Sequence, residues 1–334
     1  MRELAGLPTG LSMLWEPVEA PAALAERFGL TDLDDVARWT TAALATTWGL
    51  RVSDVPRAVV SDRNAVVWAG TTTSAERGRV VVKWSCAPER FERLAASTQL
   101  TTLLAERGVP VAAPVPALDG STRVVLPGPV GPLSVCVLPE VAGDWLDVAD
   151  LDAVRAAGAC LAQVHAALAE APAELEVAVE PTAGGALADQ VGAWLADHDH
   201  GLVPEASTRL AALAAGAPAL DDAPQLVHHD VRAANVLVRD GEVVALLDLE
   251  EVALRHRVDD LAKACTYLAT RFTAWAPTPP AARRALVEGY ESVRRLSAAE
   301  RRWLDVLLLW HAVMAVSSPD DPAGWADAAR RLSG

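Results

Sequence analysis

The stretch of sequence that decides the fold lies between residues 227 and 250. It reads Val227-His228-His229-Asp230-Val231-Arg232-Ala233-Ala234-Asn235-Val236-Leu237-Val238 and continues, after a short turn, as Ala245-Leu246-Leu247-Asp248-Leu249-Glu250. Apolar, strand-like runs flank a polar loop that holds Asp230 and Asn235, and the last run delivers Asp248. We expect these three oxygen-bearing side chains to meet at the mouth of a hairpin. Because Mg²⁺ takes one or two protein oxygens together with substrate phosphates, the pattern predicts metal ligands at Asn235 and Asp248. Asp230 is then free to accept a hydroxyl proton.

The composition limits the class of protein. The chain has 334 residues, 51% of them hydrophobic, with 29 basic and 44 acidic side chains and a formal net charge of −15. Its length predicts two structural units or one two-lobed domain, and its apolar content excludes global disorder. So acidic a chain lacks the positive charge that binds a phosphate backbone, which excludes nucleic acid as a partner. The charge suits a cationic small molecule, although solubility through self-repulsion explains it equally well.

The cysteines and the apolar stretches point to a cytoplasmic protein. No signal peptide is expected, because the N-terminus lacks a charged segment followed by an apolar one. The longest apolar stretch, Leu304 to Val316, is too short to span a bilayer, so we expect no membrane contact. Four cysteines lie far apart without a C-x-x-C pair, and we interpret them as reduced core thiols: Cys86, Cys136, Cys160 and Cys265. The oligomeric state is expected to be a monomer or a homodimer.

Lysine is rare in this chain. Of the 29 basic residues, 27 are Arg and only Lys83 and Lys263 are Lys. Such a bias is typical of a GC-rich genome, in which Arg replaces Lys wherever charge alone matters. The two lysines are therefore candidates for places that need a compact ammonium group, with chance retention as the alternative.

The order of the predicted elements indicates an α+β, bilobal architecture. Residues 1–50 are predicted to be a helical N-terminal extension. Residues 51–140 are predicted to form a small β-rich N-lobe with a five-stranded sheet and one helix, from about residue 88 to residue 107. Residues 141–334 are predicted to form a larger, mainly helical C-lobe that carries the loop described above, and a cleft between the lobes is the default site.

Several chemistries are excluded because their motifs are absent. Neither lysine follows a Gly, so there is no Walker A loop. No His is followed by Glu, which excludes H-E-x-x-H metalloproteases. G-x-S-x-G and G-x-G-x-x-G patterns are also absent.

The ordered motifs resemble a known family. The pattern H-x-D-x-x-x-x-N at residues 228–235, followed by Leu246-Leu247-Asp248, is similar to the aminoglycoside phosphotransferase and choline kinase-like branch of the protein-kinase fold. Asp260-Leu261-Ala262 matches that family's D-L-A, and Leu161–His165 resembles its L-x-x-L-H helix end. Lys83 at the end of a Val-rich run matches its strand lysine, and residues 137–143 resemble its hinge. The resemblance covers about residues 57–317.

The resemblance implies a role for each matched residue. Asp230 is the catalytic residue that orients or deprotonates the acceptor hydroxyl, and Mg²⁺ is bound by Asn235 and Asp248. The nucleotide, ATP or GTP, is bound by Lys83 through its phosphates, by Ser61 and Asn64 in the phosphate loop, and by Pro139 and Val141 in the hinge. His228, Arg232 and Asp260 support the catalytic loop, and His165 is expected to be a packed, hydrogen-bonded core histidine.

Three features depart from the family pattern. His229 stands where the family usually has Gly, and its side chain either crowds the loop or reaches the substrate. The phosphate loop Ser61-Asp62-Arg63-Asn64 contains no Gly. The acidic partner of Lys83 is not evident, with Glu89, Glu92, Gln99 or no residue as the alternatives.

The predicted function is a small-molecule kinase that phosphorylates a hydroxyl. The leading substrate is an aminoglycoside or a related cationic antibiotic, favoured by the net charge and by acidic residues near the predicted cleft, Glu250, Glu251 and Asp259. The alternative is homoserine or another amino alcohol, because residues 285–300 are similar to homoserine kinase type II proteins. A nucleotide-binding pseudokinase without transfer activity is the other class. Protein-kinase activity is disfavoured, since no A-P-E segment follows Asp248.

Overall fold

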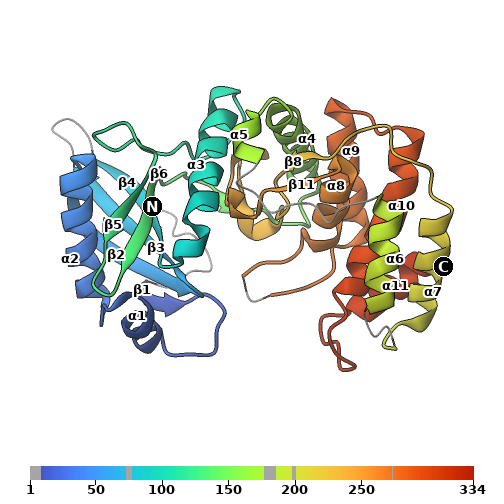
Figure 1. Cartoon of the computed structure of the whole chain (residues 1–334), viewed down its shortest axis with the longest axis horizontal. Helices are drawn as coiled ribbons and strands as arrows, with labels where there is room; N and C mark the ends of the chain where they lie inside the picture. The colour runs from blue at the N-terminus through green and yellow to red at the C-terminus, as the bar shows by residue number, and fades with distance from the viewer. Residues whose placement is uncertain (1–8, 73–76, 177–185, 198–200, 273) are drawn as a thin grey trace. The chain divides into compact units, whose positions relative to one another are not determined.

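The computed structural model describes residues 9–72, 77–176, 186–197, 201–272 and 274–334 (Figure 1). The chain divides into two units, Met1–Gly143 and Asp144–Gly334. The first unit is built on a β-sheet and the second is mainly helical. Among the described helices, none is long and apolar enough to cross a membrane.

A six-stranded sheet forms the first unit, with the strand order β1-β2-β3-β4-β6-β5. β1 pairs with β2 in parallel, and the other neighbouring strands are antiparallel. The strands are β1 (Gly10–Met13), β2 (Arg51–Ser61), β3 (Asn64–Thr72), β4 (Arg77–Ser85), β5 (Arg123–Pro127) and β6 (Pro132–Pro139). The helices are α1 (Ala20–Phe28), α2 (Leu33–Ala43) with a π-helical turn at Leu44–Trp48, and α3 (Phe91–Glu106).

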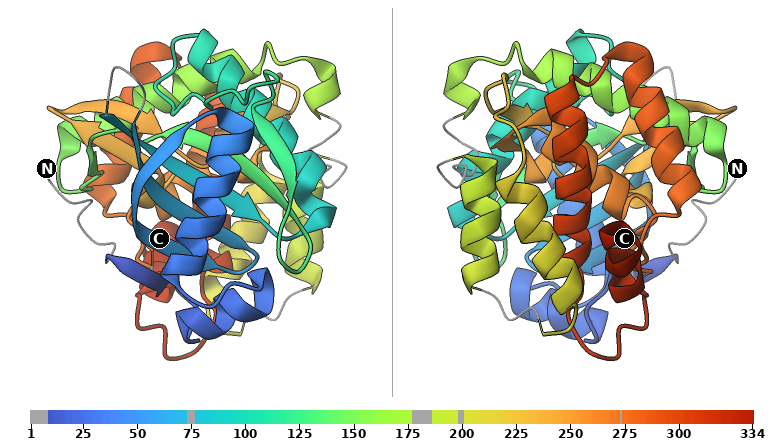
Figure 2. Two further views of the ribbon diagram at one scale, coloured as in Figure 1. Left: turned by 90° about the vertical axis from the view of Figure 1, so that its left-hand side faces the viewer. Right: turned by 90° about the vertical axis from the view of Figure 1, so that its right-hand side faces the viewer.

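Residues 9–50 pack in this sheet unit, whereas the sequence predicted a helical N-terminal extension before a five-stranded sheet. The sixth strand, β1, is only four residues long, too short for an alternating pattern to reveal it. Leu24 and Phe28 of α1 and Val36 of α2 are buried in one cluster with Val82 and Trp84 of β4. Figure 2 (left) shows α2 lying across the face of the sheet. These helices cover the sheet because an amphipathic helix must bury its apolar face against another element.

The second unit combines helices with two small sheets. β9 and β10 form a hairpin, and β7 pairs with the other edge of β9. β8 pairs with β11 in the second small sheet. Figure 2 (right) shows the side of this unit formed by α6, α7, α10 and α11. The strands are β7 (Asp144–Trp145), β8 (Gln225–Val227), β9 (Val236–Arg239), β10 (Glu242–Leu246) and β11 (Ala253–Arg255). The helices are α4 (Leu151–Leu168), α5 (Ala173–Glu176), α6 (Leu187–Asp197), α7 (Pro204–Ala215), α8 (Arg257–Tyr267), α9 (Pro280–Val293), α10 (Ala298–Met314) and α11 (Trp325–Ser333).

Two glycines let α4 and α9 pack backbone against backbone. A Cβ on Gly158 of α4 would collide with the carbonyl oxygen of Leu286, and a Cβ on Gly289 of α9 would collide with the carbonyl oxygen of Arg155. Because backbone atoms stand on both sides of the contact, neither helix can give way locally. This close approach sets the position of the side chains that α4 and α9 present to the neighbouring helix α8.

We expect Gly289→Ala to lower the free energy of unfolding by about 2–3 kcal/mol, because the added methyl group overpacks a backbone contact. Gly192→Ala in α6 is the matched control, since a Cβ there meets open space. Alanine has a higher helix propensity than glycine, so this control should raise the free energy of unfolding by about 1 kcal/mol. Urea denaturation followed by circular dichroism measures both. Equal effects of the two substitutions would contradict the close α4–α9 contact.

Candidate active site

The loop between β8 and β9 is held at its first residue, His228. The His228 side chain is buried. Its Nε2–H donates to the carbonyl oxygen of Leu247 (3.0 Å), and its Nδ1 accepts a hydrogen bond from the backbone amide of Asp230 (3.2 Å). One neutral imidazole therefore connects the loop to the segment after β10. The sequence predicts a supporting role for His228, and the structure places its side chain between the loop and this segment.

Asp230 lies between two hydrogen-bond donors. Its Oδ2 accepts from Nε of Arg232 at 3.1 Å and from Nδ2 of Asn235 at 2.8 Å. Burial raises the pKa of the Asp230 carboxyl, and the nearby charge of Asp248 raises it further, while Arg232 partly opposes both effects. The result is a fixed carboxylate that accepts a proton more readily than an ordinary aspartate.

Asn235 and Asp248 offer the donor set of a Mg²⁺ site. Nδ2 of Asn235 donates to both the backbone carbonyl and the carboxylate of Asp230, each at 2.8 Å, which turns its Oδ1 away from Asp230. The backbone amide of Leu247 donates to the carbonyl of Asn235 at 2.8 Å, which places the next residue, Asp248, beside this loop. Asp248 has a left-handed backbone, with φ 66° and ψ 68°, a conformation that in non-glycine residues often marks functional sites. An amide oxygen and a carboxylate are ligands that suit Mg²⁺.

Within the described residues, no group of three or more His, Cys, Asp or Glu side chains is arranged to hold a metal by itself. A site with two protein ligands would therefore depend on phosphate oxygens from the nucleotide to complete its coordination.

Asp260 in the first turn of α8 connects the loop to the helical core. Its Oδ2 accepts from the backbone amide of His228 (3.2 Å) and from Nε2 of His165 (2.9 Å), and its Oδ1 accepts from the amide of His229 (2.9 Å). The other nitrogen of His165 accepts from the hydroxyl of Tyr290 at 2.9 Å. His165 is on α4 and Tyr290 is on α9, so the glycine contact between these helices positions the whole chain of hydrogen bonds. His165 is the buried, hydrogen-bonded histidine that the sequence predicted.

Asp260 should contribute to stability above about pH 4. Burial alone would raise its pKa, but the hydrogen bond from His165 and nearby positive charge lower the pKa from 3.8 to about 2. A lowered pKa in the folded state stabilises the protein above the unfolded pKa, and this contribution is lost as pH falls from about 4 to about 2. We expect Asp260→Asn to lower the free energy of unfolding by about 3 kcal/mol at pH 7 and to flatten the acid limb of the stability curve. Urea denaturation at several pH values measures both; an unchanged acid limb would contradict this assignment.

His229 occupies a left-handed position, with φ 63°, next to Asp230. Its Nδ1 lies 3.3 Å from Nζ of Lys263, which is one turn beyond Asp260 on α8. Burial lowers the pKa of His229 to about 4, and the charge of Lys263 adds to this effect. The sequence left open whether this side chain crowds the loop. The structure accommodates it against the ammonium group of Lys263.

Aromatic side chains that no sequence motif predicts lie near the loop. The guanidinium of Arg232 lies 6.0 Å from the ring centre of Trp275, which is 54% exposed. Trp145 and Phe272 meet edge to face at 5.3 Å. These residues come from three separate segments of the second unit, so no local pattern connects them.

The residues predicted to bind the nucleotide lie in the first unit. Ser61 ends β2 and pairs in register with Asn64, the first residue of β3, across the two-residue turn at Asp62 and Arg63. Lys83 lies opposite Val66 on one side and Cys136 on the other. Pro139 ends β6, and Val141 follows in the segment before Gly143. Of the alternatives for the partner of Lys83, Glu89 pairs with Arg63 at 3.3 Å, and Glu92 and Gln99 are exposed.

The acidic residues predicted to face a substrate differ in their surroundings. Glu250 and Glu251 lie in the short 3-10 turn directly after Asp248. Asp259 is only 3% exposed and accepts a hydrogen bond from Nε2 of His311 at 2.9 Å. Asp259 is therefore part of the helical core and does not present its charge to a ligand.

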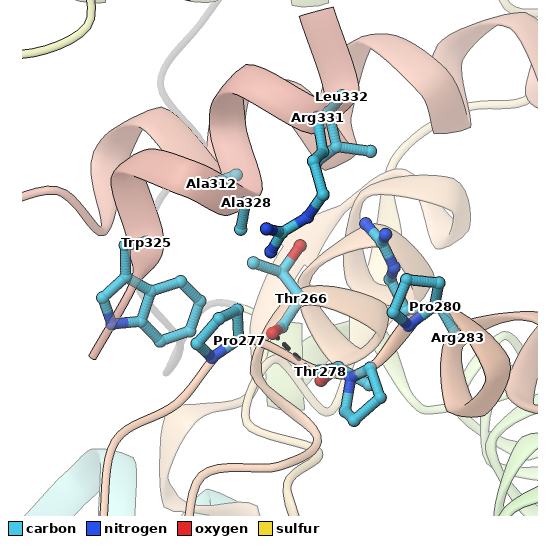
Figure 3. A pocket seen from close by; sticks show the side chains of 11 residues that line it. Thr266, Pro277, Thr278, Pro280, Arg283, Ala312, Trp325, Ala328, Arg331 and Leu332 are labelled. Carbon is cyan, nitrogen blue, oxygen red and sulfur yellow. Dashed lines mark hydrogen bonds between the residues drawn. The ribbon is translucent and has the colours of Figure 1, made fainter.

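A small pocket of about 60 Å³ lies between α8, α9 and α11 (Figure 3). Its lining includes Thr266, Thr278, Arg283, Trp325 and Arg331, and none of the predicted site residues. A pocket of this size is far smaller than one that holds a nucleotide or a drug-sized molecule. It is not the candidate active site.

Comparison with known proteins supports the resemblance seen in the sequence. The profile of the phosphotransferase enzyme family (APH) matches residues 57–330. The chain belongs to this family. The homoserine kinase of Gluconacetobacter diazotrophicus is 35% identical over 208 residues, which cover 61% of this chain and 62% of that protein. The match thus spans less than two thirds of this relative's length.

Solved structures confirm the protein-kinase-like fold of this APH family member. An amicoumacin kinase in complex with AMP-PNP, Ca²⁺ and Ami has a TM-score of 0.56 and 16% identity, covering 90% of this chain and 92% of the other. A microcompartment-associated aminopropanol kinase has a TM-score of 0.56 and 17% identity, covering 89% and 95%. At these identities the likeness concerns the fold alone.

Proposed function

We propose that this APH family member is an active small-molecule kinase, which transfers the γ-phosphoryl group of ATP or GTP to the hydroxyl of a small, amine-bearing acceptor. The observation that carries the proposal is the Asp230 carboxylate, held by Arg232 and Asn235 and with a raised pKa. In the transfer, the acceptor oxygen forms a bond to the γ-phosphorus while the bond to the β-phosphate oxygen breaks. Asp230 orients the hydroxyl and takes its proton, and the nucleoside diphosphate leaves.

The other residues have binding roles in this proposal. Asn235 and Asp248 would hold Mg²⁺, which neutralises phosphate charge when it is bound. Lys83, together with Ser61 and Asn64, would bind the phosphates, and the backbone of Pro139 and Val141 would bind the base. Arg232 keeps Asp230 in place through its Nε. A pseudokinase is disfavoured because the chain retains Lys83, Asp230, Asn235 and Asp248 together.

The acceptor that we favour is an amino alcohol or a hydroxy amino acid, rather than an aminoglycoside. Asp259, one of three acidic residues that favoured a cationic antibiotic, is bound to His311 inside the helical core. The Asp230 carboxylate contacts Arg232, and the His229 imidazole contacts Lys263; both of these partners are cationic. The nearby Asp260 carboxylate is already bound by backbone amides and by His165. The curated relatives at 30–35% identity are named homoserine kinases, whereas the antibiotic kinases are similar at fold level only.

The test is the consumption of ATP and GTP by the purified chain with Mg²⁺, against a panel of homoserine, threonine, aminopropanol, choline and aminoglycosides. We expect acceptor-dependent release of nucleoside diphosphate, with the greatest kcat/KM for a small amino alcohol or hydroxy amino acid. Turnover restricted to aminoglycosides would overturn the acceptor class. Nucleotide binding without transfer to any acceptor would favour the pseudokinase.

A further inference from the structure

The ammonium group of Lys263 is in an unusual electrostatic position. Neighbouring cations of the second unit each contact a carboxylate: Arg232 contacts Asp230, Arg255 contacts Asp259 and Arg257 contacts Asp222. The recorded contact of Lys263 is instead with an uncharged acceptor, Nδ1 of His229 at 3.3 Å. Within the part of the chain that the structure describes, no carboxylate forms an ion pair with Lys263. An ammonium group whose contact is with an uncharged acceptor, and which has no carboxylate within ion-pair distance among the described residues, is a position that favours an anionic ligand.

His229 adds a second donor to this position. Its Nδ1 faces the ammonium group and must carry a lone pair, so the ring is neutral and its proton is on Nε2. The lowered pKa of His229 agrees with this protonation state. Nε2 has no hydrogen-bond partner among the described residues. The ammonium of Lys263 and the Nε2–H of His229 thus provide two donors, the number that a carboxylate group can use with its two oxygens.

The pair is next to the reacting group. His229 directly precedes Asp230, and its backbone amide is fixed by Asp260, so the imidazole and the catalytic carboxylate belong to one rigid turn. The ammonium group of Lys263 lies 3.3 Å from the imidazole of the residue directly before Asp230. An acceptor whose hydroxyl meets Asp230 would therefore have its next few atoms within reach of His229 and Lys263. A polycationic acceptor would be repelled at this point.

We propose that Lys263 and His229 form a subsite for a carboxylate group of the acceptor, so that the enzyme selects hydroxy amino acids over the amino alcohols that lack this group. This inference rests on the proposed kinase function and specifies its acceptor. It also gives a role to the second of the two lysines in the chain. A compact ammonium fits beside the imidazole, whereas a planar guanidinium would need more space.

The test uses acceptor pairs that differ only in the carboxylate. Each acid, homoserine or threonine, is compared with the aminopropanol that remains when its carboxylate is removed. Both pairs are measured in the wild type and in Lys263→Met. We expect the wild type to favour the acids, and Lys263→Met to lower the ratio of kcat/KM for acid over amino alcohol by about 10–100-fold, mainly through KM for the acid. Lys263→Arg should retain part of the preference. His229→Gly, which suits the left-handed backbone, should lower the ratio to a smaller extent.

Arg257→Gln is the matched control, because it removes a cation from the same helix but from a contact with Asp222. It should leave the acid-to-alcohol ratio unchanged. An equal fall of kcat for acid and alcohol in Lys263→Met, or no preference for the acid in the wild type, would overturn the subsite.

Binding separates the two proposals. The thermal shift given by homoserine, compared with that given by the matching aminopropanol, is measured in the wild type and in Lys263→Met. Phosphoryl transfer that is indifferent to the carboxylate would overturn the subsite and retain the kinase. Binding of the acid through Lys263 without any transfer would retain the subsite and overturn the kinase. Absence of both would overturn both.

Discussion

Replacing Asp230 by alanine is expected to lower kcat by about 10²–10⁴-fold, the usual effect of removing a positioned acid–base group. The carboxylate is fixed by Arg232 and Asn235, and its pKa is raised by burial and by Asp248, so it is suited to take the acceptor proton. Its nucleotide contacts are expected to be few, because other residues are predicted to bind the nucleotide: Lys83, Ser61, Asn64, Pro139 and Val141. Nucleotide affinity should therefore stay within a few-fold of wild type. Steady-state kinetics and calorimetric titration of the nucleotide measure the two quantities.

A second substitution separates proton transfer from positioning. Asp230→Asn retains an oxygen that can accept from Arg232 and Asn235, but it cannot take a proton. If Asp230 acts as a base, Asn should be almost as inactive as Ala. An active Asp230→Asn variant would reduce the role of this residue to orientation. A loss of nucleotide binding equal to the loss of kcat would remove Asp230 from either role.

The loop that carries Asp230 could be predicted because the residues that define it lie close together in the sequence. The spacing from His228 to Asp248 fits one strand, one loop and one hairpin, and the structure places β8, β9 and β10 around it. The flanking apolar runs predict the strands, and the polar residues between two such strands are expected in the connecting loop.

The supporting contacts could not be predicted because they join distant segments. Tyr290 reaches His165 across 125 positions of sequence, and only the packing at Gly158 and Gly289 brings them together. Likewise, the sequence predicts that Asp259 lies near the cleft, whereas His311, 52 positions away, donates to it in the helical core. Lys263 was noticeable as one of two lysines, but its contact with His229 depends on how α8 meets the loop. Such pairings are set by tertiary packing, which a single sequence does not encode in any short pattern.

Replacing Asp248 by asparagine is expected to raise the Mg²⁺ concentration needed for half-maximal activity by about 100-fold or more. The substitution removes the one full negative charge of the proposed two-ligand site, leaving only amide oxygens for a hard divalent cation. The fold should tolerate it, because Asn adopts the left-handed backbone of residue 248 nearly as readily as Asp. Glu242→Gln, at the start of β10 in the same hairpin, removes the same charge away from the loop and is the matched control.

Calorimetric titration of Mg²⁺ tests the site more directly than activity does. With only Asn235 and Asp248 as protein ligands, the free enzyme should bind Mg²⁺ weakly, and affinity should increase strongly with a non-hydrolysable nucleotide, whose phosphates complete the octahedron. Asp248→Asn should abolish most of this increase, and Glu242→Gln should preserve it. Should the affinity be independent of nucleotide, or unchanged in Asp248→Asn, then Asp248 is a structural carboxylate at the end of a hairpin. The strained backbone at this position would then serve the turn rather than a metal, and phosphate binding would depend on Lys83, Ser61 and Asn64.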